Sequence, residues 1–246
     1  FEFLRDRRRQ ARGADHDDGV PAVRQTAQVL FLFFAEFEHL TKRTKSSRRW
    51  LDEHESDPYV KQARQAGFRS RAVFKLEEIQ RTDRIIRPGM SIVDLGAAPG
   101  GWSQLAARLL HGKGRIVALD ILPMDAIVGV DFLQGDFSDN VVLEQLEQLM
   151  GEDRPQLVMS DMAPNTTGIA DVDHDRCMHL VELTLDFARR RLAPGGDYLV
   201  KVFQGRHFQP FVKELRGSFA TVKVRKPAAS RQRSPELYLL ARQFKA

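Results

Sequence analysis

The sequence is poor in cysteine, since Cys177 is the only one among its 246 residues. A single thiol excludes an internal disulfide framework and a cysteine-rich zinc site, and we assign no metal ligands. Long hydrophobic runs are also missing, because the apolar run 29–35 is far shorter than the roughly 18 residues that a membrane-spanning helix needs. Hydrophobic residues still make up 42% of the chain, which excludes wholesale disorder. We therefore expect a cytoplasmic protein without a membrane partner.

Charge is unevenly distributed along the chain, although the net charge is only +5. Residues 216–246 carry eight Lys or Arg and one acidic residue, and residues 61–88 carry eight and three. Residues 120–200 reverse this balance, with five basic and sixteen acidic residues. Basic surfaces of this kind attract polyanions such as nucleic acid. The alternative is that these charges form solvated faces that keep the protein soluble.

Residues 1–48 differ from the remainder in having polar clusters and no regular period, so we treat them as an N-terminal extension with no assigned chemistry. Residues 49–246 show the hydrophobic periodicity of one folded domain. The predicted strands are residues 90–95, 115–120, 130–134, 156–161, 197–202, 220–225 and 236–242. The predicted helices are residues 59–66, 72–80, 102–110, 139–149, 173–192 and 208–216. Ser70 is predicted to cap the second helix.

The alternation of these strands and helices predicts a mainly parallel sheet that is covered on both faces. No long helix separates the last two strands, which predicts an antiparallel hairpin at one edge of the sheet. This pattern is typical of a doubly wound α/β domain of the Rossmann type.

A glycine-rich loop, Gly96-Ala97-Ala98-Pro99-Gly100-Gly101, follows the first predicted strand. In a doubly wound sheet the ligand lies beyond the carboxyl ends of the strands, so this loop is expected at the binding crevice. Asp120 ends the next strand and is placed to accept hydrogen bonds from ribose hydroxyls. Asp136 follows the third strand and is placed to contact adenine. The alternative for both carboxylates is that they cap helices or turns.

The loop favours S-adenosylmethionine over a dinucleotide. The dinucleotide fingerprint is G-x-G-x-x-G, and here no second glycine stands two residues after Gly96. Pro99 also removes an N–H group that a pyrophosphate would use. An NAD-dependent oxidoreductase on the same fold remains the less favoured alternative.

Two charged residues lie near the same edge of the predicted sheet. Asp161 ends the fourth strand, and Lys201 stands inside a strand that is otherwise apolar. Burial lowers the pKa of a lysine while a neighbouring carboxylate opposes that shift, and the balance between them makes an amine usable as a general base. The alternative is a lysine whose side chain extends from the strand end to water.

Six stretches carry long motifs: GFRSRAVFKL at 67–76, VDLGAAPGGWSQ at 93–104, DFLQGD at 131–136, SDMAPN at 160–165, VKVFQG at 200–205 and VRKP at 224–227. With these motifs the chain from Arg49 onward resembles the FtsJ/RrmJ family of ribosomal RNA 2′-O-methyltransferases. Within that family the chain resembles the type that methylates a uridine of large-subunit ribosomal RNA. Two segments depart from the family pattern, the first 40 or so residues and residues 206–210.

The resemblance implies S-adenosylmethionine as cofactor and a catalytic set of two lysines, an aspartate and a glutamate. The matching catalytic positions are Lys75, Asp161, Lys201 and Glu236. The matching cofactor contacts are Gly100, Trp102, Asp120, Asp136 and Asp161. Lys201 is the position that the family uses as proton acceptor. By their local sequence alone, Lys75 on a helix and Glu236 on an edge strand are expected to be solvated.

The resemblance implies that the substrate is the ribose of a uridine in large-subunit ribosomal RNA. We expect this RNA to be bound within the ribosomal subunit, and we expect the protein to be a monomer. Phosphate contacts are expected from Arg64, Arg69, Arg71, Arg84, Lys223, Arg225, Lys226, Arg231 and Arg233. Two alternatives stay open: a 2′-O-methyltransferase acting on transfer RNA or a messenger RNA cap, and a non-catalytic RNA-binding module.

Overall fold

The computed structural model describes residues 56–246 except 165–167, 169 and 232–233. The predicted extension 1–48 and Arg233 therefore lie outside the described residues. The chain divides into two units, 1–53 and 54–246, and everything below concerns the second. Within the part that is described, no helix combines the length and the apolar character needed to cross a membrane.

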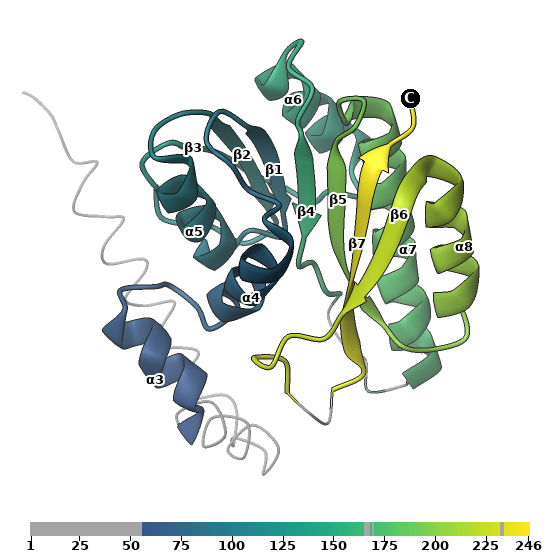
Figure 1. Ribbon diagram of the computed structural model, residues 1–246, viewed down its shortest axis with the longest axis horizontal. Helices are drawn as coiled ribbons and strands as arrows, with labels where there is room; N and C mark the ends of the chain where they lie inside the picture. The colour runs from purple at the N-terminus through teal and green to yellow at the C-terminus, as the bar shows by residue number, and fades with distance from the viewer. Residues whose placement is uncertain (1–55, 165–167, 169, 232–233) are drawn as a thin grey trace, which may run out of the picture. The chain divides into compact units, whose positions relative to one another are not determined.

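A seven-stranded sheet forms the centre of the domain (Figure 1). Its strands are β1 (Ser91–Leu95), β2 (Arg115–Asp120), β3 (Val130–Gln134), β4 (Leu157–Ser160), β5 (Asp197–Phe203), β6 (Phe219–Arg225) and β7 (Glu236–Phe244). In space their order is β3-β2-β1-β4-β5-β7-β6. The first five pair in parallel, and β7 lies antiparallel to both β5 and β6. The prediction of a mainly parallel, doubly wound sheet with an antiparallel C-terminal edge is confirmed.

Helices cover both faces of this sheet (Figure 1). Their bounds are α3 (Pro58–Gln65), α4 (Val73–Asp83), α5 (Gly101–Leu110), α6 (Asn140–Met150), α7 (Ala170–Arg191) and α8 (Phe208–Ser218). One core cluster joins α3, α4 and α5 to the sheet, and the other joins α6, α7 and α8 to its opposite face. In β4, Val158 packs into one cluster while Leu157 and Met159 pack into the other. Burial on both faces explains why such a strand is continuously apolar.

The chain order reverses between β1 and β4, the central parallel pair. β1 leads outward to β2 and β3, whereas β4 leads in the other direction to β5. Loops that leave the carboxyl ends of β1 and β4 therefore diverge and leave a crevice between them. The glycine loop follows β1 and Asp161 follows β4, so both lie at this crevice.

The predicted cap of the second helix was wrong. The N-cap of α4 is Ala72, and no side chain caps the helix. The Ser70 carbonyl accepts a backbone hydrogen bond from Val73 at 3.4 Å, so Ser70 belongs to a turn before the helix. A side chain on Gly101 would collide with the Ser70 hydroxyl, which shows how closely this turn packs on the glycine loop.

Candidate active site

The glycine loop needs its glycines because of the protein around it. Gly96 and Gly100 have φ values of 79° and 107°, in the region that favours glycine. A Cβ atom on Gly96 would lie 2.5 Å from the Cγ atom of Met162, which follows β4. The loop thus packs directly on the segment that carries Asp161.

A pocket of about 980 Å³ opens at this crevice. Its walls come from the glycine loop, from the segments after β2 and β3, from residues 161–164 and from the first half of α7. The carboxylates that line it in the described part of the chain are those of Asp120, Asp136, Asp161 and Asp175. Among the described residues of the lining, Arg176 alone carries a permanent positive charge. The pocket therefore attracts a cation and repels a pyrophosphate.

Two of the predicted cofactor contacts line the pocket and also hold its walls. The Asp120 carboxylate accepts hydrogen bonds from the backbone N–H groups of Ala98 and Leu122, each at 2.8 Å. The Oδ1 atom of Asp136 accepts hydrogen bonds from the side chain and backbone of Ser138, which lower the pKa of Asp136. The structure thus joins both sequence interpretations, because each carboxylate organises a turn and faces the pocket.

Two other predicted cofactor contacts, Trp102 and Gly100, are not among the residues that line the pocket. Trp102 is only 3% exposed, and its indole N–H donates to the backbone oxygen of Ala72 at 2.9 Å. Its ring packs against that of Tyr238, with centroids 5.7 Å apart. A Cβ atom on Gly100 would point at Ile127. Any contact of these two residues with a ligand must come from the backbone.

The four predicted catalytic residues are brought together, and a fifth residue links them. Lys75 Nζ lies 2.8 Å from Glu236 Oε1 and donates to the hydroxyl of Tyr238 at 3.0 Å. The Tyr238 hydroxyl donates to Asp161 Oδ1 at 2.7 Å. Lys201 Nζ donates to the backbone oxygen of Asp161 at 2.5 Å and lies 3.2 Å from its Oδ1 atom. These contacts form one continuous line in which the neutral Tyr238 hydroxyl joins the Lys75–Glu236 ion pair to the Lys201–Asp161 ion pair.

The antiparallel β7 makes this arrangement possible. Its first residues lie beside the carboxyl ends of the parallel strands, with Glu236 opposite Phe203 and Tyr238 opposite Lys201. Glu236 and Tyr238 are two residues apart, so their side chains share one face of the strand. Sequence reasoning missed Tyr238, although this period-two spacing from Glu236 was a signal that pointed to it.

Burial and charge set the protonation of the linked groups. Burial alone raises the pKa of Asp161, but the charges of Lys201 and Lys75, with a hydrogen bond from Tyr238, outweigh it and hold that pKa below its usual range. Burial raises the pKa of Tyr238 well above its usual value, and the charges of Asp161 and Glu236 add to the effect. Asp161 is therefore a carboxylate and Tyr238 a neutral hydroxyl at neutral pH. Lys201 is 7% exposed, which rules out the alternative of a lysine extended into water.

Asp94 is a further buried carboxyl group, on β1 beneath the site. It has no exposed surface, and burial raises its pKa to about 7. The Ser103 hydroxyl donates to its Oδ2 atom at 2.6 Å, while its Oδ1 atom has no partner among the described residues.

The two arginines that precede α4 were predicted as RNA contacts, and both bond to the protein. Arg69 donates to three backbone carbonyls beside the pocket. Arg71 pairs with Asp57, the N-cap of α3, and donates to the backbone oxygen of Ala229 in the β6–β7 connection. Arg71 therefore joins two loops, and its side chain is 16% exposed.

The basic residues of β6 and the β6–β7 connection are also engaged. Arg225 and Lys223 both bond to Asp83 at the end of α4, with nitrogen–oxygen distances of 2.7 and 3.2 Å. The hydrogen bond from Arg225 is the largest of the effects that lower the pKa of Asp83. Lys226 donates to the backbone oxygen of Glu236 at 2.5 Å. Two other predicted contacts, Arg64 and Arg84, are exposed, and Arg231 is half-buried with an interaction of its own.

The segment 206–210, which departs from the family pattern, packs against α7. Arg206 bonds to Asp175 at 2.5 Å, and the ring of His207 stacks on that of His174 with centroids 5.5 Å apart. Because Asp175 lines the pocket, this departure lies at the pocket wall.

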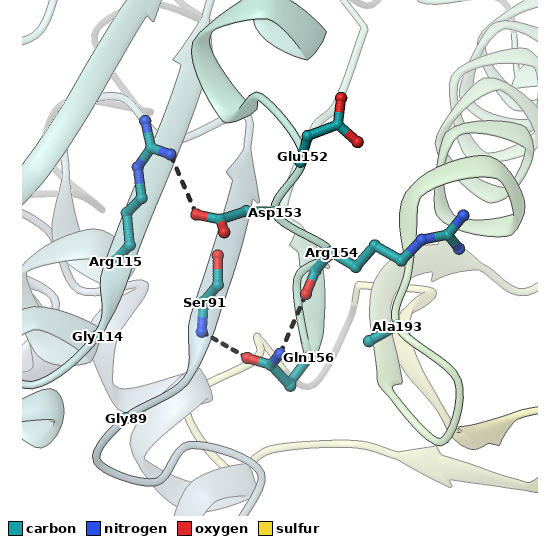
Figure 2. Close-up of a pocket in the computed structure, with 9 residues that line it drawn as sticks. All are labelled: Gly89, Ser91, Gly114, Arg115, Glu152, Asp153, Arg154, Gln156 and Ala193. Atoms are coloured by element: carbon teal, nitrogen blue, oxygen red, sulfur yellow. Dashed lines mark hydrogen bonds and ion pairs between the residues drawn. The ribbon is translucent and has the colours of Figure 1, made fainter.

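A second pocket, of about 560 Å³, lies at the opposite edge of the sheet, where β1 and β2 begin. Figure 2 shows Arg115 directed at Asp153, to which it is paired at 3.3 Å. The Gln156 side chain accepts from the backbone of Ser91 and donates to the backbone of Arg154 (Figure 2). These groups satisfy one another, and the predicted catalytic residues lie at the carboxyl ends of the strands instead, so we assign this pocket no chemistry.

Comparison with known proteins relates the chain to methyltransferases. The model of the FtsJ-like methyltransferase family matches residues 68–244, well over half of the chain. The crystal structure of a protein described as a ribosomal RNA methyltransferase of Plasmodium falciparum is 28% identical in sequence, with a TM-score of 0.66. That match covers 72% of this chain and 98% of the other. The fibrillarin/Nop5p complex matches at 18% identity and a TM-score of 0.51, over 69% and 80% of the two chains, which shows the fold alone.

Proposed function

Because the chain belongs to the FtsJ-like methyltransferase family, as its motifs predicted, we propose that it transfers a methyl group from S-adenosylmethionine to a ribose 2′-oxygen of ribosomal RNA. Methyl transfer to RNA follows from the family and is supported by the likeness to the Plasmodium falciparum protein. The target atom, a uridine of the large-subunit RNA and the identity of the general base are the finer parts of the proposal.

The pocket fits the proposed methyl donor. Its volume of about 980 Å³ lies at the upper end of the range for sites that enclose small ligands. Its carboxylates suit a sulfonium cation, whereas an NAD pyrophosphate would be repelled. Asp120 would hold the ribose hydroxyls, and Asp136, whose Oδ2 atom has no donor among the described residues, would accept from the adenine amino group. Bound there, S-adenosylmethionine supplies an activated methyl group.

One observation carries the catalytic assignment: Asp161 both lines this pocket and bonds to Lys201. We assign Lys201, once its ammonium has released a proton to water, as the group that accepts the proton of the ribose 2′-hydroxyl as its oxygen attacks. The Asp161 carboxylate, kept ionised by its neighbours, stabilises the ammonium that forms on Lys201. The amine is thus held beside the pocket in a site from which water is largely excluded.

Lys75 has a different role in this proposal. Its side-chain nitrogen donates to both Glu236 and Tyr238, and these bonds fix its position. Tyr238 in turn donates to Asp161, so the Glu236–Lys75–Tyr238 line orients the carboxylate that faces Lys201. Lys75, Glu236 and Tyr238 are therefore positioning residues, whose loss misplaces Asp161 rather than removing the base.

RNA would approach over the basic face formed by α3, α4 and the β6–β7 hairpin. The exposed Lys and Arg residues of these elements and of the loop after α4 are Lys61, Arg64, Arg81, Arg84, Arg87, Lys223 and Lys226. Phosphate contacts on this face predict binding that weakens steeply with salt. A ribose 2′-hydroxyl target also requires RNA rather than DNA.

The proposal is tested with methyl-labelled S-adenosylmethionine, purified protein and separate pools of ribosomal subunits, ribosomal RNA, transfer RNA and capped messenger RNA. Methylation of a 2′-oxygen removes the nucleophile for alkaline cleavage, so we expect the label in an alkali-resistant dinucleotide from large-subunit RNA. Label on a base would contradict the target atom, and label confined to transfer RNA or a cap would contradict the substrate. Absence of transfer to every RNA would favour a non-catalytic RNA-binding module.

A further inference from the structure

Arg69 occupies an unusual place between the two loops that form the pocket. Its Nη1 atom donates to the backbone oxygen of Pro99 in the glycine loop at 3.3 Å and to that of Asp125 at 2.6 Å. Its Nη2 atom donates to the backbone oxygen of Ala126 at 2.9 Å. Three of the five guanidinium N–H groups are thus committed to backbone carbonyls. The carbonyls belong to the loops after β1 and after β2.

Close packing accompanies these hydrogen bonds. A Cβ atom on Gly100 would lie 2.7 Å from Ile127 Cδ1, 2.9 Å from Met124 Sδ and 3.1 Å from Arg69 Nη1. The absence of a side chain at Gly100 therefore lets the segment 121–129 and the guanidinium of Arg69 rest on the glycine loop. This glycine serves contact between protein segments at its Cα side, rather than the approach of a ligand.

The backbone of Arg69 is held in place as well as its guanidinium group. Its backbone N–H donates to Gln104 Oε1 at 3.2 Å, and Gln104 Nε2 donates to the backbone oxygen of Gly67 at 2.8 Å. Gln104 belongs to α5, so the segment 67–69 is anchored on a helix that packs in the core. The segment that carries Arg69 is therefore rigidly supported.

Asp120 ties the same two loops on the pocket side, through the N–H groups of Ala98 and Leu122. Arg69 ties them on the outside, through Pro99, Asp125 and Ala126. Loss of the outer tie would let the segment after β2 move away from the glycine loop. The Asp120 carboxylate, whose position depends on both loops, would move with it.

We propose that Arg69 is a positioning residue for the methyl donor, which clamps the two pocket loops and thereby fixes Asp120, rather than primarily a phosphate contact. This inference rests on the proposed function, because it assigns the pocket to S-adenosylmethionine. It separates Arg69 from Arg71, which lies two residues later and joins the α3 N-cap to the β6–β7 connection instead.

The test compares wild-type protein with Arg69→Gln, Arg69→Lys and Arg71→Gln, by calorimetric titration with S-adenosylmethionine in the absence of RNA. We expect Arg69→Gln to raise the dissociation constant about tenfold, while Arg71→Gln, with the same loss of charge, stays within about twofold. Arg69→Lys keeps the charge but offers one nitrogen for three carbonyls, so it should recover less than half of the loss in log affinity. Equal affinity of wild type and Arg69→Gln, or full recovery with Lys, would overturn the inference.

Two further measurements separate the possible failures. Hydrogen exchange of the backbone amides at 121–129 should speed up in Arg69→Gln but not in Arg71→Gln, and equal exchange in all proteins would refute the clamp. The salt dependence of RNA binding should be unchanged in Arg69→Gln, whereas a reduced slope with unchanged cofactor affinity would make Arg69 a phosphate contact. If the wild-type protein itself binds no S-adenosylmethionine, the proposed function fails, and the exchange measurement still decides whether the clamp exists.

Discussion

Replacement of Asp94 by asparagine tests how burial affects the ionisation of a carboxyl group on β1, the strand that leads into the glycine loop. The Asp94 side chain is fully buried on β1, and its pKa of about 7 is raised mainly by burial, against the Ser103 hydrogen bond that lowers it. The negative charges of Asp161 and Asp120 add to the increase. In the unfolded chain the carboxyl group returns to its ordinary pKa of 3.8.

Between these two pKa values the folded protein keeps a proton on Asp94 that the unfolded chain has lost. The free energy of unfolding therefore falls as pH rises through this window, with a slope of about 1.4 kcal/mol per pH unit. Over the window from pH 3.8 to about 7 the loss is on the order of 4 kcal/mol. Asp94→Asn keeps the shape of the side chain and removes the titration.

The assay is urea unfolding of wild type and Asp94→Asn at pH values from 4.5 to 8. The advantage of the asparagine variant should grow with pH and level off above about pH 7. Asp136→Asn is the control, because hydrogen bonds from Ser138 lower the pKa of Asp136 below 3.8, so the difference between wild type and this variant should stay constant from pH 4.5 to 8. A wild-type-to-Asp94→Asn difference that is constant across the range would refute the reasoning.

Three other substitutions probe the residues around the pocket. Tyr238→Phe removes the hydroxyl between Lys75 and the site carboxylate, so single-turnover methyl transfer should slow about ten- to a hundredfold with little change in RNA affinity. Lys75→Met strands the carboxylate of Glu236 and should lower the free energy of unfolding by about 3 kcal/mol in urea titrations, part of which Lys75→Met/Glu236→Gln recovers. Gly96→Ala places a Cβ atom 2.5 Å from Met162 at a positive φ, which should destabilise the fold by about 2 kcal/mol and weaken cofactor binding in calorimetry. Retention of wild-type values in any of these measurements would contradict the contact concerned.

Much of the sheet could be predicted from local patterns. The predicted strands 115–120 and 130–134 have the same bounds as β2 and β3, because turn residues border short apolar runs on both sides. The predicted strand 156–161 is one residue longer than β4 at each end, and the backbone N–H groups of these end residues, Gln156 and Asp161, still donate to Ser91 and Leu95 of β1. The antiparallel hairpin was predicted, but not that β7 would lie between β5 and β6.

This insertion of β7 explains why the expectation that Glu236 and Lys75 are solvated was wrong. A glutamate on the outermost strand would face water, whereas β6 is the outermost strand and β7 is flanked on both sides. The Lys75 and Glu236 side chains are 12% and 13% exposed and pair with each other. Local sequence does not encode this long-range neighbour, so the family pattern was needed to find the pair.

Sequence alone also did not reveal which basic residues are paired with carboxylates of the protein. Composition counts the charge of Arg71 and Arg225, but not the carboxylates that fold against them. Asp57 pairs with Arg71, and Asp83 pairs with Arg225, across 14 and 142 residues of sequence. Charge that is engaged in this way supports the fold first, and the exposed residues of α3 and α4 are the better candidates for phosphate contact.

The most direct test of the whole account is single-turnover methyl transfer by Lys201→Ala, with saturating S-adenosylmethionine and RNA. Because the amine of Lys201 is the proposed proton acceptor beside Asp161, we predict a rate about a thousandfold below wild type, with affinities for both ligands within a few fold. Thermal unfolding of the same sample verifies that the variant is folded. A folded, ligand-saturated Lys201→Ala protein that transfers the methyl group within tenfold of the wild-type rate would contradict the mechanism.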